Sequence, residues 1–573
     1  MSHATTYGRT VLRAPAKATE CTTLAWSNTF TRELPGDAAV EEAPYAILEK
    51  EKSGEQTVDI PEVLFRASRE VRGLWSWAVA EQHENPQLVS VSPSGAQLVG
   101  LSASAFWRDA DTAAMAWSGS TRLAGSNMWA HNYGGHQFGI WAGQLGDGRA
   151  MSLGETVHNS CRWEVQLKGA GPTPYVRMAD GYAVRRSSIR EYLAAEHMHA
   201  LGVPTARSLS LVFTDREVVR EERERGAVVA RLAPSWVRFG SFELPASRAD
   251  HVTTKQLADY VIRHHYPDIT HNPYIQLLER AVASTAQMVA RWQAVGFCHG
   301  VMNTDYMSLL GLTIDYGPFA FLDAYDPDFI CNHSDPSGRY AFNEQPRVAL
   351  WNLTRLAAPL AALINQSADP SGSEQTVNVI TDALNAFGPQ FSAEYARVMR
   401  RKFGLFAVAR DDDVDVVVQP FLDLLAEAGT DYAFAMRTLC SVPEALSSNT
   451  LDAVVDGLAL RSQTIACDVT AWKRRVSEYF TTVYGPRLER ESADATVGER
   501  MKRENPNFVL RNWVAQDIIA RADKGDFAWV DQVLKLLTVH AFDDHAPAGM
   551  EDAEKYAGPV PDWGEGLQCS CSS

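Results

Sequence analysis

The chain has 573 residues, 46% hydrophobic and 21% charged, a composition typical of a globular protein with room for about two to four domains. Its formal net charge of −17 argues against binding to nucleic acid, and no apolar run reaches the roughly 18 residues of a membrane span. We therefore expect neither nucleic acid nor membrane as a partner. The eight cysteines lack the paired spacing of zinc sites, which favours a reducing compartment.

Composition and periodicity predict successive regions at residues 1–24, 25–125, 126–250, 251–450 and 451–573. The first region is rich in Ser and Thr with a single acid, compatible with a flexible N-terminus and an organelle transit peptide. The second is predicted to be an N-terminal extension. The third is glycine-rich and strand-like, and the last two are mainly helical. From Asp543 onward, Pro, Gly and acidic residues predict a flexible, cysteine-containing tail.

The third region contains a candidate phosphate site. Glycines in Gly143–Arg149 permit close approach of backbone N–H groups to an anion, although a simple hairpin turn fits the same pattern. In Trp163–Lys168 apolar and polar residues alternate, so Lys168 projects opposite the core face. This lysine is a candidate phosphate ligand or a solvated lysine on an edge strand.

A helix is predicted from about Ser188 to Leu201, and it carries Glu191 in its first turn. In kinases a glutamate at this place pairs with the strand lysine and fixes it toward the phosphates. The sequence Ser188-Ile-Arg-Glu191 is also a capping-box pattern. Glu191 therefore has two competing interpretations, an ion pair with Lys168 or a cap of its own helix.

Further polar residues flank these elements. Arg231 and Arg238 lie on either side of a proline-containing bend and are able to converge on a polyphosphate, or else form surface salt bridges. Asp180-Gly181 lies in a turn that either contacts a nucleotide or only stabilises the turn.

The segment from His299 to Tyr306, followed by Asp315-Tyr-Gly317, resembles a kinase catalytic loop and its metal-binding triplet. Val301 stands where the kinase Asp is needed, and its side chain cannot accept a proton. Asp315 keeps the type expected of a magnesium ligand. We expect His299 to be a structural hydrogen-bonding residue. The loop predicts nucleotide binding without ordinary kinase chemistry.

The order of these elements predicts an α+β fold, a bilobal protein-kinase-like fold with extensions at both ends. Residues 126–250 would form the β-rich N-lobe and residues 251–450 the helical C-lobe with the catalytic loop. Residues 451–573 would add a helical C-terminal region and the tail.

The chain resembles the selenoprotein O family, kinase-like protein adenylyltransferases, from about Leu24 to the C-terminus. The resemblance is carried by the motifs Phe30–Gly36, His136–Gly139, Trp141–Arg149, Gln166–Pro174, Arg186–Glu191, His299–Asp305, Thr313–Pro318, Cys331–Asp335, Leu350–Leu353 and Asn505–Trp513. It implies a pseudokinase that binds ATP in a flipped orientation and transfers AMP to Ser, Thr or Tyr hydroxyls of proteins, releasing pyrophosphate. The expected partners are ATP and protein substrates, and the expected state is a monomer.

The resemblance also implies residue roles. Asp305 would accept the proton, Lys168 and Glu191 would form the ion pair, and Asp315 would hold Mg²⁺ or Mn²⁺. The residues implied to bind ATP are Gly146, Gly148, Arg149, Lys168, Asp180, Gly181, Arg231, Arg238 and Asp315. A redox pair of Cys331 with Cys571, third from the end, is implied as well. Eukaryotic relatives suggest a mitochondrial protein, bacterial relatives a cytoplasmic one.

Two departures from the family pattern bear on activity. Tyr306 replaces the Asn that serves as the second metal ligand, and a phenol is a poor magnesium ligand; Asn303 is a conceivable substitute. Tyr182 replaces a usual Arg. An active adenylyltransferase, a catalytically impaired ATP-binding pseudoenzyme and a true phosphotransferase remain as hypotheses, the last disfavoured by Val301.

Overall fold

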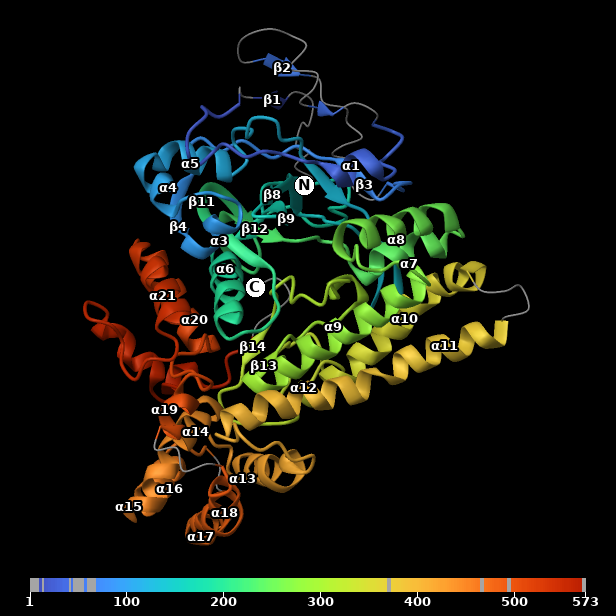
Figure 1. Cartoon of the computed structure of the whole chain (residues 1–573). Coiled ribbons are helices and arrows are strands. Elements are labelled where there is room, and N and C mark those ends of the chain that lie inside the picture. The colour runs from blue at the N-terminus through green and yellow to red at the C-terminus, as the bar shows by residue number, and fades with distance from the viewer. Residues whose placement is uncertain are drawn as a thin grey trace.

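A computed structural model describes residues 10–12, 15–40, 43–44, 56–58, 69–367, 373–463, 468–491 and 496–568. Strands gather in the upper part of the view and long helices in the lower part (Figure 1). The fold is thus mixed α/β with an antiparallel sheet in its N-terminal half, which confirms the expected class at that level.

The main sheet is antiparallel, and its central strands position the site. In spatial order its strands are β3 (Trp75–Trp77), β5 (Trp129–His131), β8 (Ala150–His158), β9 (Cys161–Lys168), β12 (Arg223–Ala233), β11 (Arg207–Val219) and β4 (Gln87–Val91), with β10 (Ala183–Val184) also pairing β12. Leu167 on β9 and Leu232 on β12 point into a buried core. The alternation of side chains therefore turns Lys168 and Arg231 to the opposite face. Lys168 is 8% exposed on an interior strand, so the edge-lysine interpretation is wrong.

Smaller elements surround this sheet. They are β1 (Thr10–Leu12), α1 (Thr29–Glu33), β2 (Gln56–Val58), α3 (Pro93–Leu98), α4 (Ala103–Arg108), α5 (Ala110–Trp117) and the hairpin of β6 (Gly134–Gln137) and β7 (Ile140–Gln144). Cys21 is fully buried, and its carbonyl accepts a hydrogen bond from the Trp117 indole at 3.0 Å. The described part of residues 1–24 is thus packed on the sheet domain at this point, where the sequence predicts flexibility.

Helix α6 (Arg185–Ala200) lies under the sheet, and α20 (Asn512–Asp523) and α21 (Ala528–Val539) lie beside it (Figure 1). Arg190 donates to the side chain of Asn512 at 3.0 Å, and His197 Nδ1 lies 2.9 Å from the carbonyl oxygen of Leu537. The C-terminal helices therefore buttress α6.

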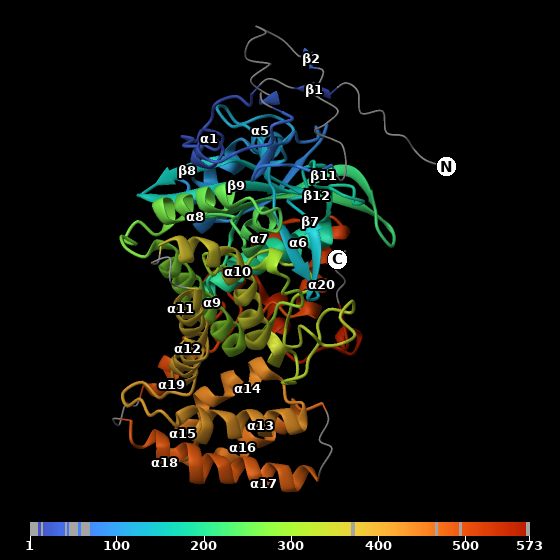
Figure 2. The same ribbon diagram turned by 90° about the vertical axis from the view of Figure 1, so that its right-hand side faces the viewer.

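Below the sheet lies a layer of helices (Figure 2). Its elements are α7 (Phe239–Ser247), α8 (His251–His265), α9 (Pro273–Val295), η3 (Phe342–Glu344), α10 (Gln345–Ser367), α11 (Ser373–Asn385) and α12 (Phe387–Lys402). Helix α9 begins with a proline that needs no N–H partner, and ends at Gly296 with φ of 70°. Within Phe342–Asn365 an 18-residue window with a mean hydropathy of 1.2 is long and apolar enough to cross a membrane. However, 56% of that window is buried in the fold, and core helices of soluble proteins have the same length and composition.

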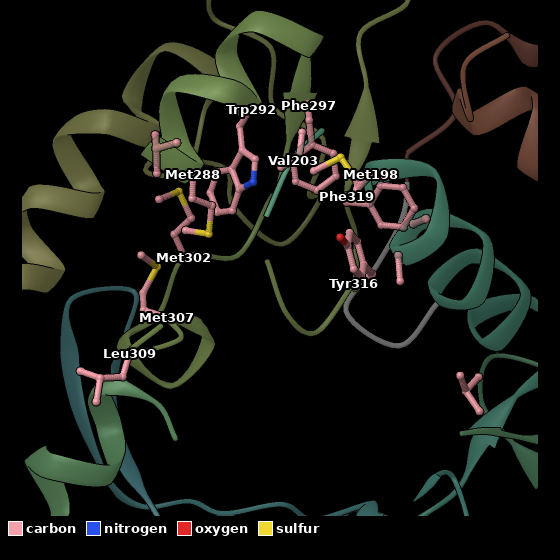
Figure 3. Packing of buried hydrophobic residues seen from close by; sticks show 14 of the residues in the cluster. Met198, Val203, Met288, Trp292, Phe297, Met302, Met307, Leu309, Tyr316 and Phe319 are labelled. Atoms are coloured by element: carbon pink, nitrogen blue, oxygen red, sulfur yellow. The ribbon is translucent and has the colours of Figure 1, made fainter. Parts of the chain in front are cut away.

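The catalytic-loop candidate follows α9. The strands β13 (Phe297–Cys298) and β14 (Ala320–Phe321) pair, and the 3-10 turn η2 (Thr304–Tyr306) lies between them in sequence. Met302 and Met307, which flank this turn, are 1% exposed. Figure 3 shows them in the cluster that includes Met288 and Trp292. Apolar packing on both sides of η2 fixes the turn.

The rest of the chain forms a helical bundle at the far end (Figure 2) and then returns to the sheet. It comprises η4 (Val414–Val418), α13 (Gln419–Ala428), α14 (Tyr432–Thr438), η5 (Leu439–Ser441), α15 (Val442–Ser448), α16 (Leu451–Leu460), α17 (Val469–Tyr479), η6 (Phe480–Tyr484), α18 (Gly485–Leu488), α19 (Val497–Lys502), α20, α21, η7 (Glu551–Ala557) and η8 (Asp562–Gly564). Tyr556 is 1% exposed and donates to Asp517 at 2.6 Å. Residues 543–568, predicted as a flexible arm, therefore contribute to the core.

Candidate active site

A cavity of about 600 Å³ lies between the sheet and the catalytic-loop candidate, within the size range of small-ligand sites. Its lining brings together the residues predicted from sequence, namely Gly146, Gly148, Arg149, Lys168, Asp180, Gly181, Arg231, Arg238, Asp305, Tyr306 and Asp315. Glu191 contacts Lys168 but does not itself line the cavity. Cys331 does not line the cavity either. Residues from β9, β12 and η2, far apart in sequence, thus share one cavity.

The glycine-rich loop is shaped first by packing. Gly146 has a φ of +109°, and a side chain there would meet the ring of Tyr175 at 2.4 Å. The loop passes over this buried tyrosine, and its glycines keep the backbone close to the cavity. Arg149, at the end of the loop, lines the cavity.

Lys168 and Glu191 form an ion pair, with Nζ to Oε2 at 2.6 Å. Helix α6 begins at Arg185 after Val184, so Ser188 is inside the helix and the capping interpretation of Glu191 is wrong. Burial lowers the pKa of Lys168, and the carboxylate of Glu191 opposes that effect. The lysine is held toward the cavity rather than toward solvent.

Asp315 pairs with three cationic side chains that line the cavity. Its Oδ1 lies 3.3 Å from Lys168 Nζ and 2.7 Å from Arg231 Nη1, and its Oδ2 pairs with Arg238. Burial opposes ionisation of this carboxyl, but Arg238, Arg231 and Lys168 outweigh it and hold its pKa well below the usual range. The interpretation of both arginines as surface salt bridges is therefore wrong, since Arg231 is 3% and Arg238 2% exposed.

Asp147 is a buried partner of Arg238 that the sequence analysis does not single out. Its Oδ1 lies 3.1 Å from Arg238 Nη2 and accepts from the hydroxyl of Tyr133 at 3.0 Å, and its Oδ2 accepts from Gln166 at 2.9 Å. One feature of the sequence could have pointed to Asp147: it is an acidic residue between two glycines, in a loop predicted to bind an anion. Such an acid requires a cation partner nearby.

Arg220 is a second residue that the sequence analysis does not single out. It lies in the turn between β11 and β12 and binds Asp180 with both terminal nitrogens, at 2.6 and 3.0 Å. Asp180 also accepts from the backbone N–H of Tyr182 at 3.0 Å, so it stabilises its turn as well as lining the cavity. Burial raises and the Arg220 hydrogen bond lowers the pKa of Asp180, with a net lowering.

Asp305 is 5% exposed, and its Oδ2 accepts from Gln137 Nε2 at 3.2 Å. Burial raises its pKa to about 7 against the lowering effects of Gln137 and Arg238. The carboxylate is therefore poised to take up a proton near neutral pH. Val301, at the kinase-base position, is buried and apolar.

The remaining loop residues have structural partners. His299 Nε2 lies 3.1 Å from the carbonyl oxygen of Ile314, which fits the structural role expected for it. Asn303 Oδ1 accepts from the hydroxyl of Tyr340 at 2.6 Å and from the N–H of Phe138 at 3.0 Å, so this oxygen is committed to the protein. Tyr306 lines the cavity at the second-ligand position.

Among the described residues no group of three or more His, Cys, Asp or Glu side chains forms a metal centre. Cys331 is 1% exposed, and its Sγ lies 3.5 Å from Sγ of Cys298. Cys571 lies outside the described residues.

The chain matches known proteins over most of its length. The family model described as "Protein adenylyltransferase SelO" matches residues 74–538. A "Protein nucleotidyltransferase YdiU" of Cupriavidus metallidurans is 46% identical over 503 residues, covering 85% of this chain and 87% of that protein. Proteins of the same name from Enterobacter sp. and Myxococcus xanthus are 42% and 43% identical, each covering 86% of this chain and 95% and 96% of their own length.

The cation-lined cavity and these relatives together define the protein as a nucleotidyltransferase. More narrowly, the chain belongs to the SelO family. The family resemblance drawn from the sequence motifs is thereby confirmed.

Proposed function

We propose that the protein transfers AMP from ATP to Ser, Thr or Tyr hydroxyls of other proteins and releases pyrophosphate. The observation that carries the proposal is Asp305, a buried carboxylate with a pKa of about 7 in the cavity that Lys168, Arg231 and Arg238 line. Val301 offers no proton acceptor at the kinase-base position, which disfavours phosphoryl transfer.

In the proposed reaction Lys168, Arg231 and Arg238 hold the outer phosphates, and the α-phosphate faces the acceptor. Phosphate oxygens would compete with Asp315 for Lys168, Arg231 and Arg238, which now neutralise that carboxylate. Asp305 would take the proton of the hydroxyl that attacks the α-phosphorus. Positioning and charge neutralisation then carry the catalysis.

Asp315 would hold magnesium, or manganese in its place, once phosphate oxygens take Lys168, Arg231 and Arg238 from it, because magnesium is held by one or two carboxylates together with phosphates. When bound, the ion supplies neutralisation of phosphate charge. Tyr306 occupies the second-ligand position and favours a second candidate function, that of an ATP-binding pseudoenzyme with impaired transfer.

Redox control through Cys331 and Cys571 belongs to the proposal as well. The burial of Cys331 implies that its segment has to open before a bond to another chain segment forms.

The test uses ATP labelled at the α- or the γ-phosphate, an acceptor protein mixture and the Asp305→Asn variant as control. AMP transfer predicts label on protein only from the α position, lost in the variant. Label from γ alone would overturn the proposal in favour of phosphoryl transfer. Nucleotide binding without label from either position would support the pseudoenzyme.

A further inference from the structure

The hairpin of β6 and β7 separates the nucleotide cavity from a second cavity. Gln137 lines the nucleotide cavity and donates to Asp305 at 3.2 Å. The preceding residue, His136, lines the second cavity of about 390 Å³, because neighbouring strand residues face opposite sides. The N–H of His136 donates to Thr304 Oγ1 at 2.7 Å, next to Asp305 in the catalytic turn. Neighbouring residues of strand β6 therefore line the two cavities, one residue in each.

The second cavity combines apolar walls with charge. Trp141 of β7 and Ala358, Pro359 and Ala362 of α10 supply apolar surface. Glu243 also lines it, and its Oε1 lies 2.5 Å from His136 Nδ1, so this carboxylate already has a partner. The cavity is large enough for an aliphatic or aromatic side chain.

Arg355 lines this cavity, and Arg339 lies outside the lining, over the ring of Trp351. The guanidinium groups of Arg339 and Arg355 lie 4.8 and 5.0 Å from the ring centroid of Trp351. Among the residues that the structure describes, neither guanidinium lies within salt-bridge distance of a carboxylate, although the charge of Arg355 acts on Glu243, which lines the same cavity. In a chain with a net charge of −17, two such arginines over one tryptophan ring form a local positive site.

The tip of the hairpin exposes apolar side chains beside these arginines. Phe138 is 38%, Ile140 74% and Trp141 37% exposed. The tip is held in place, since the N–H of Phe138 donates to the hydroxyl of Tyr340 at 3.0 Å and the two rings are 5.1 Å apart. An exposed apolar surface on a fixed hairpin is typical of a binding site.

We propose that this surface, the acceptor platform of Phe138, Ile140, Trp141, Arg339 and Arg355, docks an acidic segment of the acceptor protein. An apolar side chain of that segment enters the second cavity, its acidic residues pair with the arginines, and its hydroxyl reaches Asp305. The inference rests on the proposed function, in which Asp305 is the base, and it names the substrate class as hydroxyl-bearing acidic segments.

The experiment measures binding without ATP, so its result is independent of AMP transfer. The probe is a fluorescent peptide with a serine, a leucine and flanking glutamates, compared with the same peptide bearing lysines instead. We expect the glutamate peptide to bind in a salt-dependent manner and the lysine peptide not to bind. Arg355→Glu or Arg339→Glu should weaken binding about tenfold or more. Equal binding of both peptides would overturn the proposal.

Arg474→Glu is the matched control, because it makes the same charge change on an exposed position of α17, at the far end of the molecule from β7 (Figure 2). It should leave peptide binding unchanged. Trp141→Ala should weaken binding of the leucine peptide more than that of an alanine peptide. If Arg355→Glu fails to fold, Arg355→Gln and a salt titration of the wild type test the same contribution of charge to peptide binding. Binding that survives both the glutamine variant and high salt would refute the docking.

Discussion

Asp147 and Arg238 form a salt bridge in which both side chains are 2% exposed, with Oδ1 and Nη2 3.1 Å apart. Arg238 also donates to the carbonyl of Asp305 at 2.9 Å and pairs with Asp315. Asp147 therefore holds Nη2 of Arg238, while Nη1 of the same guanidinium contacts Asp305 and Asp315 in the cavity. A cation fixed before the ligand arrives loses less freedom on binding.

Asp147→Asn should weaken ATP binding about tenfold, because an amide cannot accept from Arg238, Tyr133 and Gln166 as a carboxylate does. The free energy of unfolding should fall by about 1–3 kcal/mol. Calorimetric titration with ATP and urea unfolding check the two effects. Asp412→Asn is the control, since Asp412 pairs with Arg410 on the surface, and it should change neither. Unaltered ATP affinity in Asp147→Asn would remove its positioning role.

Tyr306→Asn should raise the rate of AMP transfer and lower the Mg²⁺ concentration needed for it, because an amide oxygen is a better ligand than a phenol. The measurement is the transfer rate against Mg²⁺ concentration. Tyr306→Phe removes the hydroxyl without adding a ligand and should give no gain. If Phe and Asn raise the rate equally, loss of the phenol hydroxyl rather than metal ligation is the cause.

The rate of transfer should rise with pH up to about 7 and level off above it. Burial raises the pKa of Asp305 to about 7, and only the deprotonated form accepts the proton of the hydroxyl. Gln137→Ala removes a hydrogen bond that lowers this pKa, so its profile should shift to higher pH. The check is kcat/KM against pH for both proteins. Superimposable profiles would contradict the assignment of Asp305 as the base.

His197 should contribute a loss of stability in mild acid, which the raised pKa of Asp305 opposes over the same range. Burial lowers its pKa from the ordinary 6.5 to about 4 in the folded protein. Between these values the unfolded chain binds the proton and the folded protein does not, so the contribution of His197 to the free energy of unfolding is constant above pH 6.5 and falls as the pH drops toward 4. The loss for this group is on the order of 3 kcal/mol.

Urea unfolding of the wild type and of His197→Gln at pH 7.5 and pH 4.5 measures this effect. The variant should lose less stability between the two pH values. His333→Gln, at an exposed position, serves as the control and should follow the wild type. A variant with the full wild-type loss would assign the acid sensitivity to other groups.

Much of the site was predictable because its residues lie in motifs with fixed local geometry. The alternation in Trp163–Lys168 gave the direction of Lys168, and the loop motif marked Asp305 and Asp315. The start of α6 was misplaced because Ser188 has the chemistry of a cap, whereas the helix begins earlier, after the extended Val184.

The missed residues act through partners that are distant in sequence. Arg220 meets Asp180 across a hairpin turn, and Asp147 meets Arg238 from another strand connection. Because the partners of such pairs lie far apart in sequence, no periodic pattern of residues predicts them. The sequence also did not predict the packing of Tyr556 in the tail. A segment rich in Pro, Gly and acidic residues has the composition of a solvated segment even when a few of its side chains are buried.

The C-terminal helices that buttress α6 have a consequence for biosynthesis. The helix carrying Glu191 is synthesised long before Asn512 and Leu537, which bind it through Arg190 and His197. During translation α6 therefore lacks both contacts until α20 and α21 have been made, and a product shortened before α20 carries the Lys168–Glu191 pair on a helix without them. The order of translation thus completes the packing around α6 only after Leu537 has been made.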